Sequence, residues 1–351
     1  MRKLFTLMFT KRFRIFHPLL ISSLIGILSI LAGISLGTLT IPFSTIIQVF
    51  LQELGWVSST SVDNTAVNII MSIRFPRVIL AFMVGGSLAV AGAAFQGLLR
   101  NPLADPYTLG VSSGASLGAV IVLFFGVSVP YLGMLTLPFI SVLSAFLTLF
   151  LVLWFTRLVE KNLSVHTIIL TGIIFSSFLG SMISLIIALS GEELRQIINW
   201  LLGSVSMRGW DYVIMILPFY AAGLLVLFFC TRELNAFSFG EEAAKHLGID
   251  VDKRKMMILV GASLLTGASV AVSGTIGFIG LVIPHITRLI WGPRHERLLP
   301  LSVINGGSFL VLADLLARTI IIPSELPVGV ITSLIGAPIF AFIFFTRSNR
   351  K

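Results

Sequence analysis

The stretch Arg74–Ala115 reads RFPRVILAFMVGGSLAVAGAAFQGLLRNPLADPYTLGVSSGA. It joins an Arg-x-Pro-Arg head to an uncharged segment, Val78–Leu99, and then to a polar turn that contains two prolines. An α-helix crosses the apolar part of a bilayer with about 20 residues, each rising about 1.5 Å. The uncharged segment reaches that length, so it predicts a transmembrane helix that ends at a turn.

Small residues recur at every fourth position along this helix and again after the turn. They are Gly85, Ala89, Ala93 and Gly97 in the first stripe, and Gly110, Gly114 and Gly118 in the second. Small side chains let helix backbones approach closely in lipid, where apolar surfaces have no water to avoid. We therefore expect both stripes to be helix-packing surfaces.

The turn between the two stripes has its own signals. Pro102 and Pro106 exclude a continuous helix, because proline lacks an N–H and clashes with the preceding turn. Asp105 suits the N-cap of the next helical segment, with Pro106 as its first residue.

The composition places the chain among membrane proteins. Its 351 residues are 56% apolar and 11% charged, and the mean hydropathy is +1.02. Soluble domains carry about 25% charged residues. A single cysteine, Cys230, excludes an internal disulfide framework.

The apolar segments predict an all-α, polytopic membrane protein with ten transmembrane helices in one domain, residues 1–351. The predicted spans are 18–37, 78–99, two spans between 105 and 157 divided at Gly126–Pro130, 162–190, 212–230, 257–274, 277–291, 299–321 and 327–346. Residues 38–73 form an outer loop with room for a short helix.

The basic residues decide the orientation. Of 24 lysines and arginines, this arrangement places 19 inside and only five outside, namely Arg74, Arg77, Arg195, Arg208 and Arg318. Loops rich in lysine and arginine stay in the cytoplasm. We therefore expect both termini, with residues 1–17, and the loop 231–256 to be cytoplasmic. The net charge of +9 then belongs to the inner membrane surface and not to a nucleic-acid site.

Several long motifs resemble one family of transport proteins. The motifs R-x-P-R, Q-x-x-x-R-N-P-L-A-D-P and L-G-x-x-x-G-A all lie within Arg74–Ala115. G-F-x-G-L-x-x-P-H-x-x-R follows at 277–288, and a further match covers 325–340. Together they resemble the permeases of ABC importers for iron-siderophores, haem and cobalamin.

The resemblance implies a function and a set of partners. We expect a permease subunit in a bacterial cytoplasmic membrane that moves a ferric-siderophore, or a related iron chelate, by ATP-driven alternating access. The implied partners are two cytoplasmic ATP-binding subunits, an extracytoplasmic substrate-binding protein, and a second permease subunit that is identical or paralogous. No cofactor or metal site is implied.

The inner loop contains a candidate coupling helix. Ser238 and Glu241 have capping-box spacing, which predicts that a short helix begins there, and Gly248 can end it in the left-handed conformation. An ordinary surface helix would explain the pattern equally well. The resemblance implies contact with the ATPase through Glu241, Glu242, Ala243, Ala244 and Gly248.

Two further groups of residues receive roles from the resemblance. The outer arginines Arg74, Arg77 and Arg318 are expected to dock the binding protein, although membrane anchoring or a local Asp314–Arg318 pair would also explain them. The turn of Asn101, Pro102, Leu103 and Ala104 is expected to narrow the cytoplasmic mouth as a gate, although a simple turn is the alternative.

Other classes of protein fit less well. Gly110–Gly114 matches G-x-S-x-G, but a proline-rich turn precedes it where a nucleophile elbow needs a strand. The sequence has no P-loop motif, so ATP hydrolysis belongs to another subunit. An ion-coupled secondary transporter is the alternative function. Such a protein would need buried acids as a relay, and Asp314 is the one acid well inside a predicted span.

Overall fold

The computed structural model describes residues 2–37, 39–56, 63–160 and 164–348. Over these residues the chain folds into helices and turns without a strand, so the predicted all-α, polytopic fold is confirmed. Met1, residues 162 and 163 of the predicted fifth span, and the last three residues of the C-terminal tail lie outside the described residues.

Each of the ten predicted spans overlaps one apolar helix. These are α1 (Arg2–Ser35), α4 (Phe75–Leu98), α5 (Val111–Phe125), α6 (Thr136–Val159), α7 (Val165–Leu189), α9 (Trp210–Phe229), α12 (Val251–Ser273), α13 (Ile279–Trp291), α14 (His295–Ala317) and α15 (Val328–Ser348). In the described chain, seven helical segments are long and apolar enough to cross a membrane, and α5, α13 and α15 supply three shorter apolar segments. The number of helices that cross the membrane stays a prediction.

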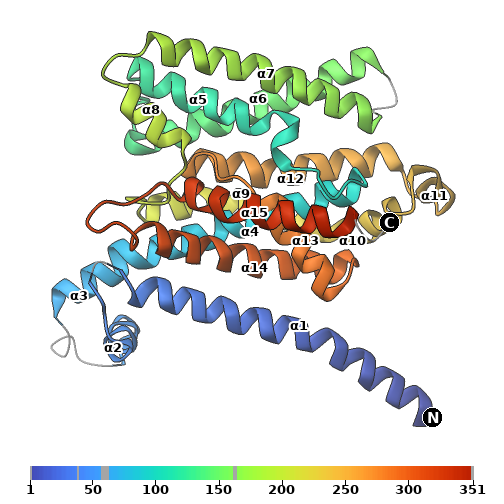
Figure 1. The fold of residues 1–351 in the computed structure, drawn as a ribbon, viewed down its shortest axis with the longest axis horizontal. Helices are drawn as coiled ribbons and strands as arrows, with labels where there is room; N and C mark the ends of the chain where they lie inside the picture. Colours follow the sequence, from blue (N-terminus) through green and yellow to red (C-terminus); the bar gives the residue numbers. More distant parts are fainter. Residues whose placement is uncertain (1, 38, 57–62, 161–163, 349–351) are drawn as a thin grey trace.

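The short helices lie at the two ends of the bundle. At one end are α2 (Phe43–Glu53), α3 (Asn64–Asn68) and α8 (Leu194–Leu201), and at the other are α10 (Thr231–Phe237) and α11 (Glu241–His246). Figure 1 shows the described ends of α1 and α15 on the same side as α11. We call this side the inner end and the opposite side the outer end, following the predicted orientation.

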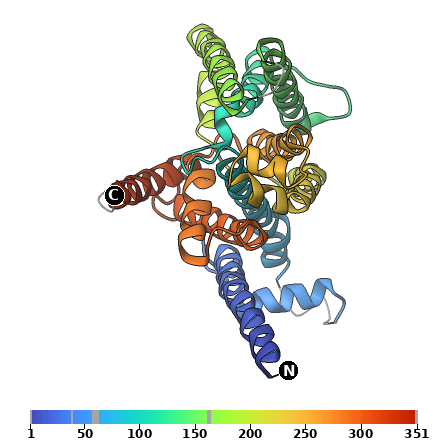
Figure 2. The same ribbon diagram turned by 90° about the vertical axis from the view of Figure 1, so that its right-hand side faces the viewer.

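Helix α4 forms the centre of the molecule. Most of its side chains are buried, and it packs against α12, α13 and α14. It begins earlier than the predicted span, because α3 and a π-helical turn, Ile69–Arg74, run directly into Phe75. Figure 2 shows the other helices arranged around this centre, with α7 and the start of α1 at the periphery.

Glycines set the distance between α4 and its neighbours. A Cβ atom on Gly85 would lie 2.3 Å from the carbonyl oxygen of Gly306 in α14, and one on Gly92 would lie 1.8 Å from the carbonyl oxygen of Gly280 in α13. Backbone lies against backbone at these two contacts. Gly114 and Gly118 of α5 instead leave room for the side chains of Thr148 and Ser144 of α6.

The turn after α4 follows the sequence prediction closely. The Asp105 side chain accepts a hydrogen bond from the backbone N–H of Tyr107 at 3.0 Å, and Pro106 is the first residue of a 3₁₀ turn, Pro106–Leu109. Gly110 then adopts φ of 77°, in the left-handed region, and precedes α5. Glycine adopts this conformation without strain, so the turn favours Gly110 at this position. Gly110 also packs closely against α7.

We predict that Gly92→Ala destabilises the protein by roughly 1–3 kcal/mol, because the added methyl group forces α4 and α13 apart. The melting temperature of the purified protein in detergent measures this effect. Gly180→Ala in α7 is the matched control, because a Cβ atom there meets nothing within 4 Å. Equal melting temperatures for the two variants would contradict close packing at Gly92.

Candidate functional site

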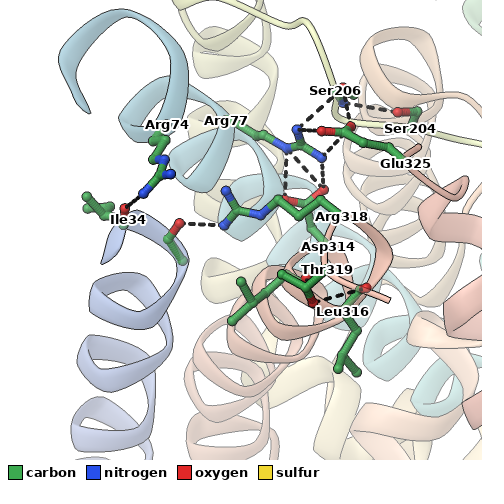
Figure 3. Close-up of polar contacts among 12 residues, drawn as sticks. Ile34, Arg74, Arg77, Ser204, Ser206, Asp314, Leu316, Arg318, Thr319 and Glu325 are labelled. Atoms are coloured by element: carbon green, nitrogen blue, oxygen red, sulfur yellow. Dashed lines mark hydrogen bonds and ion pairs between the residues drawn. The ribbon is translucent and has the colours of Figure 1, made fainter. Parts of the chain in front are cut away.

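A buried ion-pair cluster lies at the outer end of α4. The Arg77 guanidinium donates from Nε to Asp314 Oδ2 at 2.9 Å and from Nη2 to Asp314 Oδ1 at 2.8 Å. On its other side, Nη1 donates to Glu325 Oε1 at 2.9 Å and Nη2 donates to Glu325 Oε2 at 3.0 Å. Figure 3 shows Arg77 between the two carboxylates. Arg77 thereby joins α4 to α14 and to the loop that precedes α15.

Ser206 extends this cluster to the loop between α8 and α9. Its hydroxyl donates to Glu325 Oε2 at 2.6 Å, and its backbone N–H donates to Ser204 Oγ at 3.0 Å. Burial by itself raises the pKa of Glu325, but the hydrogen bonds from Arg77 and Ser206 and the charge of Arg77 outweigh it. The pKa of Glu325 therefore lies below its ordinary value.

Arg74 and Arg318 both reach the end of α1. Arg74 Nη1 donates to the carbonyl oxygens of Ile34 at 2.8 Å and Ser35 at 3.0 Å. Arg318 Nη2 donates to the carbonyl oxygen of Gly33. The last carbonyls of a helix have no partner within the helix and favour cations. The two arginines therefore fasten α1 to the rest of the outer end (Figure 3).

All three arginines that the sequence singled out meet at this end, and all three are buried. The local Asp314–Arg318 pair is present at 3.8 Å, but Asp314 binds Arg77 more closely. Sequence reasoning missed Glu325 and Ser206 as partners of Arg77. Glu325 is the one acid next to the outer end of the predicted tenth span, and this position could have indicated it as a partner for an outer arginine.

The inner loop folds into α10 and α11. Gly240 precedes α11 as its N-cap, while the Ser238 hydroxyl donates to the carbonyl oxygen of Asn235 at 2.6 Å. The predicted capping box is therefore wrong, because a turn after α10 engages Ser238. Gly248 has φ of 79° and closes the C-terminal end of the helix, as predicted.

One ion pair anchors α11 to α12. Lys255 Nζ lies 2.8 Å from Glu241 Oε1, and the Lys255 side chain is 1% exposed. A second pair, Arg254 Nε to Glu233 Oε1 at 3.2 Å, joins α12 to α10. Glu242 is exposed and Ala244 is buried, and the flanking apolar side chains Phe239 and Leu247 point to the outside. The helix thus presents an outward surface on a fixed base.

The predicted gate residues form a compact turn between α4 and the 3₁₀ turn. Asn101 Oδ1 accepts a hydrogen bond from the N–H of Leu103 at 2.9 Å, and the Asn101 carbonyl accepts one from Ala104 at 3.0 Å. Ala104 is buried and Leu103 is exposed. Within the described part of the chain, no three histidine, cysteine or acidic side chains come together as metal ligands.

A bundle of apolar helices with a surface helix anchored at one end defines the class: a multi-pass transport permease. The chain belongs to the FecCD transport family, whose model matches residues 24–346. It is a permease of an ABC importer family, a transport subunit and not an enzyme.

Two relatives agree with this assignment. The chain is 60% identical to the uncharacterised ABC transporter permease protein YvrB of Bacillus subtilis over 91% of this chain and 90% of the relative. It is 42% identical to the cobalamin import system permease protein of Halobacterium salinarum over 82% of this chain and 76% of that relative.

A solved structure shares the fold. It shows an inward-facing conformation of a metal-chelate type ABC transporter, with a TM-score of 0.79 and 30% sequence identity. The match covers 93% of this chain and 97% of the solved chain. The fold and the motifs of the sequence therefore lead to the same family.

We predict that Asp314→Asn lowers the stability of the protein by about 3 kcal/mol, because removal of one partner leaves buried Arg77 undercompensated. Thermal unfolding in detergent measures the loss. Asp211→Asn, which changes an exposed aspartate of α9, is the control and is expected to leave the melting temperature nearly unchanged. A small effect at Asp314 would show that Glu325 alone compensates Arg77.

We predict a pH dependence for Glu325→Gln. Because the folded state lowers the pKa of Glu325, its contribution to stability is complete above about pH 4.3 and is lost as the pH falls through the lowered value. The variant should therefore melt below the wild type at pH 7, and the difference should close in acid. Melting curves from pH 7 to pH 3 measure this, with Glu53→Gln as the exposed control.

Proposed function

We propose that this chain carries a ferric-siderophore, or a related iron chelate, across the cytoplasmic membrane of a bacterium by ATP-driven alternating access. The observation that carries the proposal is α11, a short surface helix held to the transmembrane bundle by the ion pair between Glu241, which is partly exposed, and the buried Lys255 of α12. The names of two relatives support the substrate class, since one imports cobalamin, a cobalt chelate, and the other is a metal-chelate type transporter.

The outward surface of α11 would transmit force to the bundle through the ion pair between Glu241 and Lys255. An ATPase subunit that displaces α11 would also displace Lys255, because the ion pair ties Glu241 of α11 to this buried side chain of α12. Helix α12 packs against α4 and α9, so the displacement enters the centre of the bundle. Glu242, Ala243 and the turn at Gly248 would contact the ATPase, while Glu241 and Ala244 hold the helix in place.

The outer end would receive the substrate-binding protein. Within this cluster, Arg74, Arg77 and Arg318 outnumber the carboxylates of Asp314 and Glu325, so the cluster keeps one excess positive charge that would attract an acidic side chain. Glu325 is partly exposed, whereas Asp314 is buried. An acidic residue of the binding protein would therefore reach Arg77 by replacing Glu325.

The remaining partners and the gate complete the proposal. Two ATP-binding subunits and a second permease subunit, identical or paralogous, would form the complex. The pathway would lie between the two permeases, and the turn Asn101–Ala104 would narrow its inner mouth.

The secondary-transporter alternative lacks a supporting observation. A proton or sodium relay depends on an acid that can lose its partner. Asp314 instead forms ion pairs with Arg77 and Arg318, and it lies in the last turn of α14, away from the middle of that helix.

The test is chelate uptake into proteoliposomes that contain the permease, its ATPase subunits and its binding protein. We expect uptake of a ferric hydroxamate chelate to require ATP and to survive a proton ionophore. Uptake that is lost to the ionophore and indifferent to the ATPase would contradict the proposal.

We predict that Lys255→Met reduces ATP-dependent uptake up to about fivefold, because the lost ion pair with the partly exposed Glu241 contributes up to about 1 kcal/mol and its loss releases the base of α11. Lys253→Met is the matched control, since this neighbouring lysine is exposed and should leave uptake unchanged. ATPase binding to each variant, measured by co-purification, separates loss of coupling from loss of assembly. Full uptake by Lys255→Met would show that α11 does not transmit force through this pair.

A further inference from the structure

A large cavity opens at the inner end of the bundle, next to the outward surface of α11 and the predicted gate turn, which contribute Phe239 and Pro102 to its wall. Its volume is about 1520 Å³. The C-terminal end of α4, the second half of α13, the start of α14, the end of α15 and the end of α10 surround it. Neither the arginine cluster of the outer end nor the Lys255–Glu241 pair contributes to it.

The wall of this cavity is strongly basic. Four arginines line it, against a single acid, Glu296; they are Arg100, Arg288, Arg294 and Arg297. Glu296 accepts a hydrogen bond from the Asn235 amide at 2.8 Å. Within the described residues, Arg100 and Arg297 form no ion pair with a carboxylate. The cavity therefore carries positive charge that the described chain does not neutralise.

A buried histidine adds a specific hydrogen-bonding group. Glu296 can only accept, so its bond with the Asn235 Nδ2 group fixes the orientation of that amide. Asn235 Oδ1 then accepts from the His295 backbone N–H and from His295 Nδ1, each at 2.9 Å. This places the ring proton on Nδ1 and leaves a lone pair on Nε2.

His295 Nε2 has no hydrogen-bond partner within the described chain, although the residue is only 3% exposed. The atom lies over Gly97, where a Cβ atom would approach it to 2.5 Å, and both residues line the cavity. Buried polar atoms are rarely left unsatisfied. Nε2 is therefore an unsatisfied acceptor in the wall of the cavity, packed close to Gly97.

The rim of the cavity is apolar. Leu289 of α13 and Phe342 of α15 line it and are 66% and 70% exposed. Figure 2 shows the C-terminal end of α15 standing away from the bundle. The basic wall lies at the inner ends of the membrane helices. At this level of a bilayer the lipid head groups meet the acyl chains, so the apolar rim would face the acyl chains.

We propose that this cavity binds the head group of an anionic phospholipid of the inner leaflet. The arginines contact the phosphate, as basic pockets between transmembrane helices do. His295 Nε2 accepts a hydrogen bond from a head-group hydroxyl, and the apolar rim contacts the acyl chains. A phosphodiester with a hydroxylated head group, such as phosphatidylglycerol, meets all three requirements. Soluble glycerol phosphate shares the polar chemistry but not the acyl chains.

The first test compares lipids on the full-length chain co-purified with its ATPase subunits. The protein is reconstituted in nanodiscs of equal parts phosphatidylglycerol and phosphatidylcholine, and the lipids it retains are counted by native mass spectrometry. We expect selective retention of phosphatidylglycerol. Equal retention of the two lipids would overturn the proposal.

Arginine variants locate the lipid. Combined Arg100→Gln and Arg297→Gln should lower the preference for phosphatidylglycerol roughly tenfold or more, since each basic group near the surface contributes about 1 kcal/mol. Combined Arg157→Gln and Arg232→Gln removes the same charge from the inner end outside the cavity and should change nothing. Lysine at positions 100 and 297 should restore retention and shows that the glutamine pair is folded. Equal losses from the two glutamine pairs would overturn the assignment to the cavity.

Two further probes separate the parts of the ligand. His295→Phe should bind phosphatidylglycerol no better than phosphatidylmethanol, which has the same charge and no head-group hydroxyl, whereas the wild type should prefer phosphatidylglycerol. Glycerol phosphate alone should not raise the melting temperature of delipidated protein. If it does so as strongly as the lipid, the phosphate site stands and the lipid as its occupant is overturned. The lipid readout does not depend on chelate transport.

Discussion

A guanidinium ion that lies 7% exposed at the end of a membrane helix needs compensation, and Arg77 obtains it from two carboxylates on other segments. The cost of burying a charge without partners is several kcal/mol, so the pairing constrains where α14 and the loop before α15 can lie. Ser206 brings in the α8–α9 loop, and Arg74 and Arg318 bring in the end of α1. The architecture of the outer end depends on this one cluster.

Further along α4, away from the cluster, the helices contact one another through their backbones and not through charged side chains. Gly85 against Gly306 and Gly92 against Gly280 bring the backbone of α4 close to the backbones of α14 and α13. Contacts of this kind have no flexible side chains that could absorb a shift of one helix. At the inner end, the Lys255–Glu241 pair restores a polar tie, now between α12 and a surface helix.

Much of this organisation could be predicted from residues alone. The apolar segments located the long helices, and Asp105, Pro106 and Gly110 specified the turn after α4, because these signals act within a few residues. The capping box at Ser238 failed, since a competing turn engaged that hydroxyl. Glu325 and Ser206 were missed because they lie 248 and 129 residues from Arg77 in the chain. The roles of the arginines in docking and of Asn101–Ala104 in gating stay predictions.

Hydropathy, helix-breaking residues and long motifs by themselves determined the class of protein, its helices and its family, because lipid imposes length and apolarity on each segment separately. Only the tertiary structure decided which charges pair. Arg77 turns inward to Asp314 and Glu325, Glu241 turns inward to Lys255, and His295 faces a basic cavity with one nitrogen unsatisfied. Asp314 and Glu325 lie 237 and 248 residues from Arg77, and Glu241 and Lys255 lie on separate helices, so no local pattern predicts these pairs.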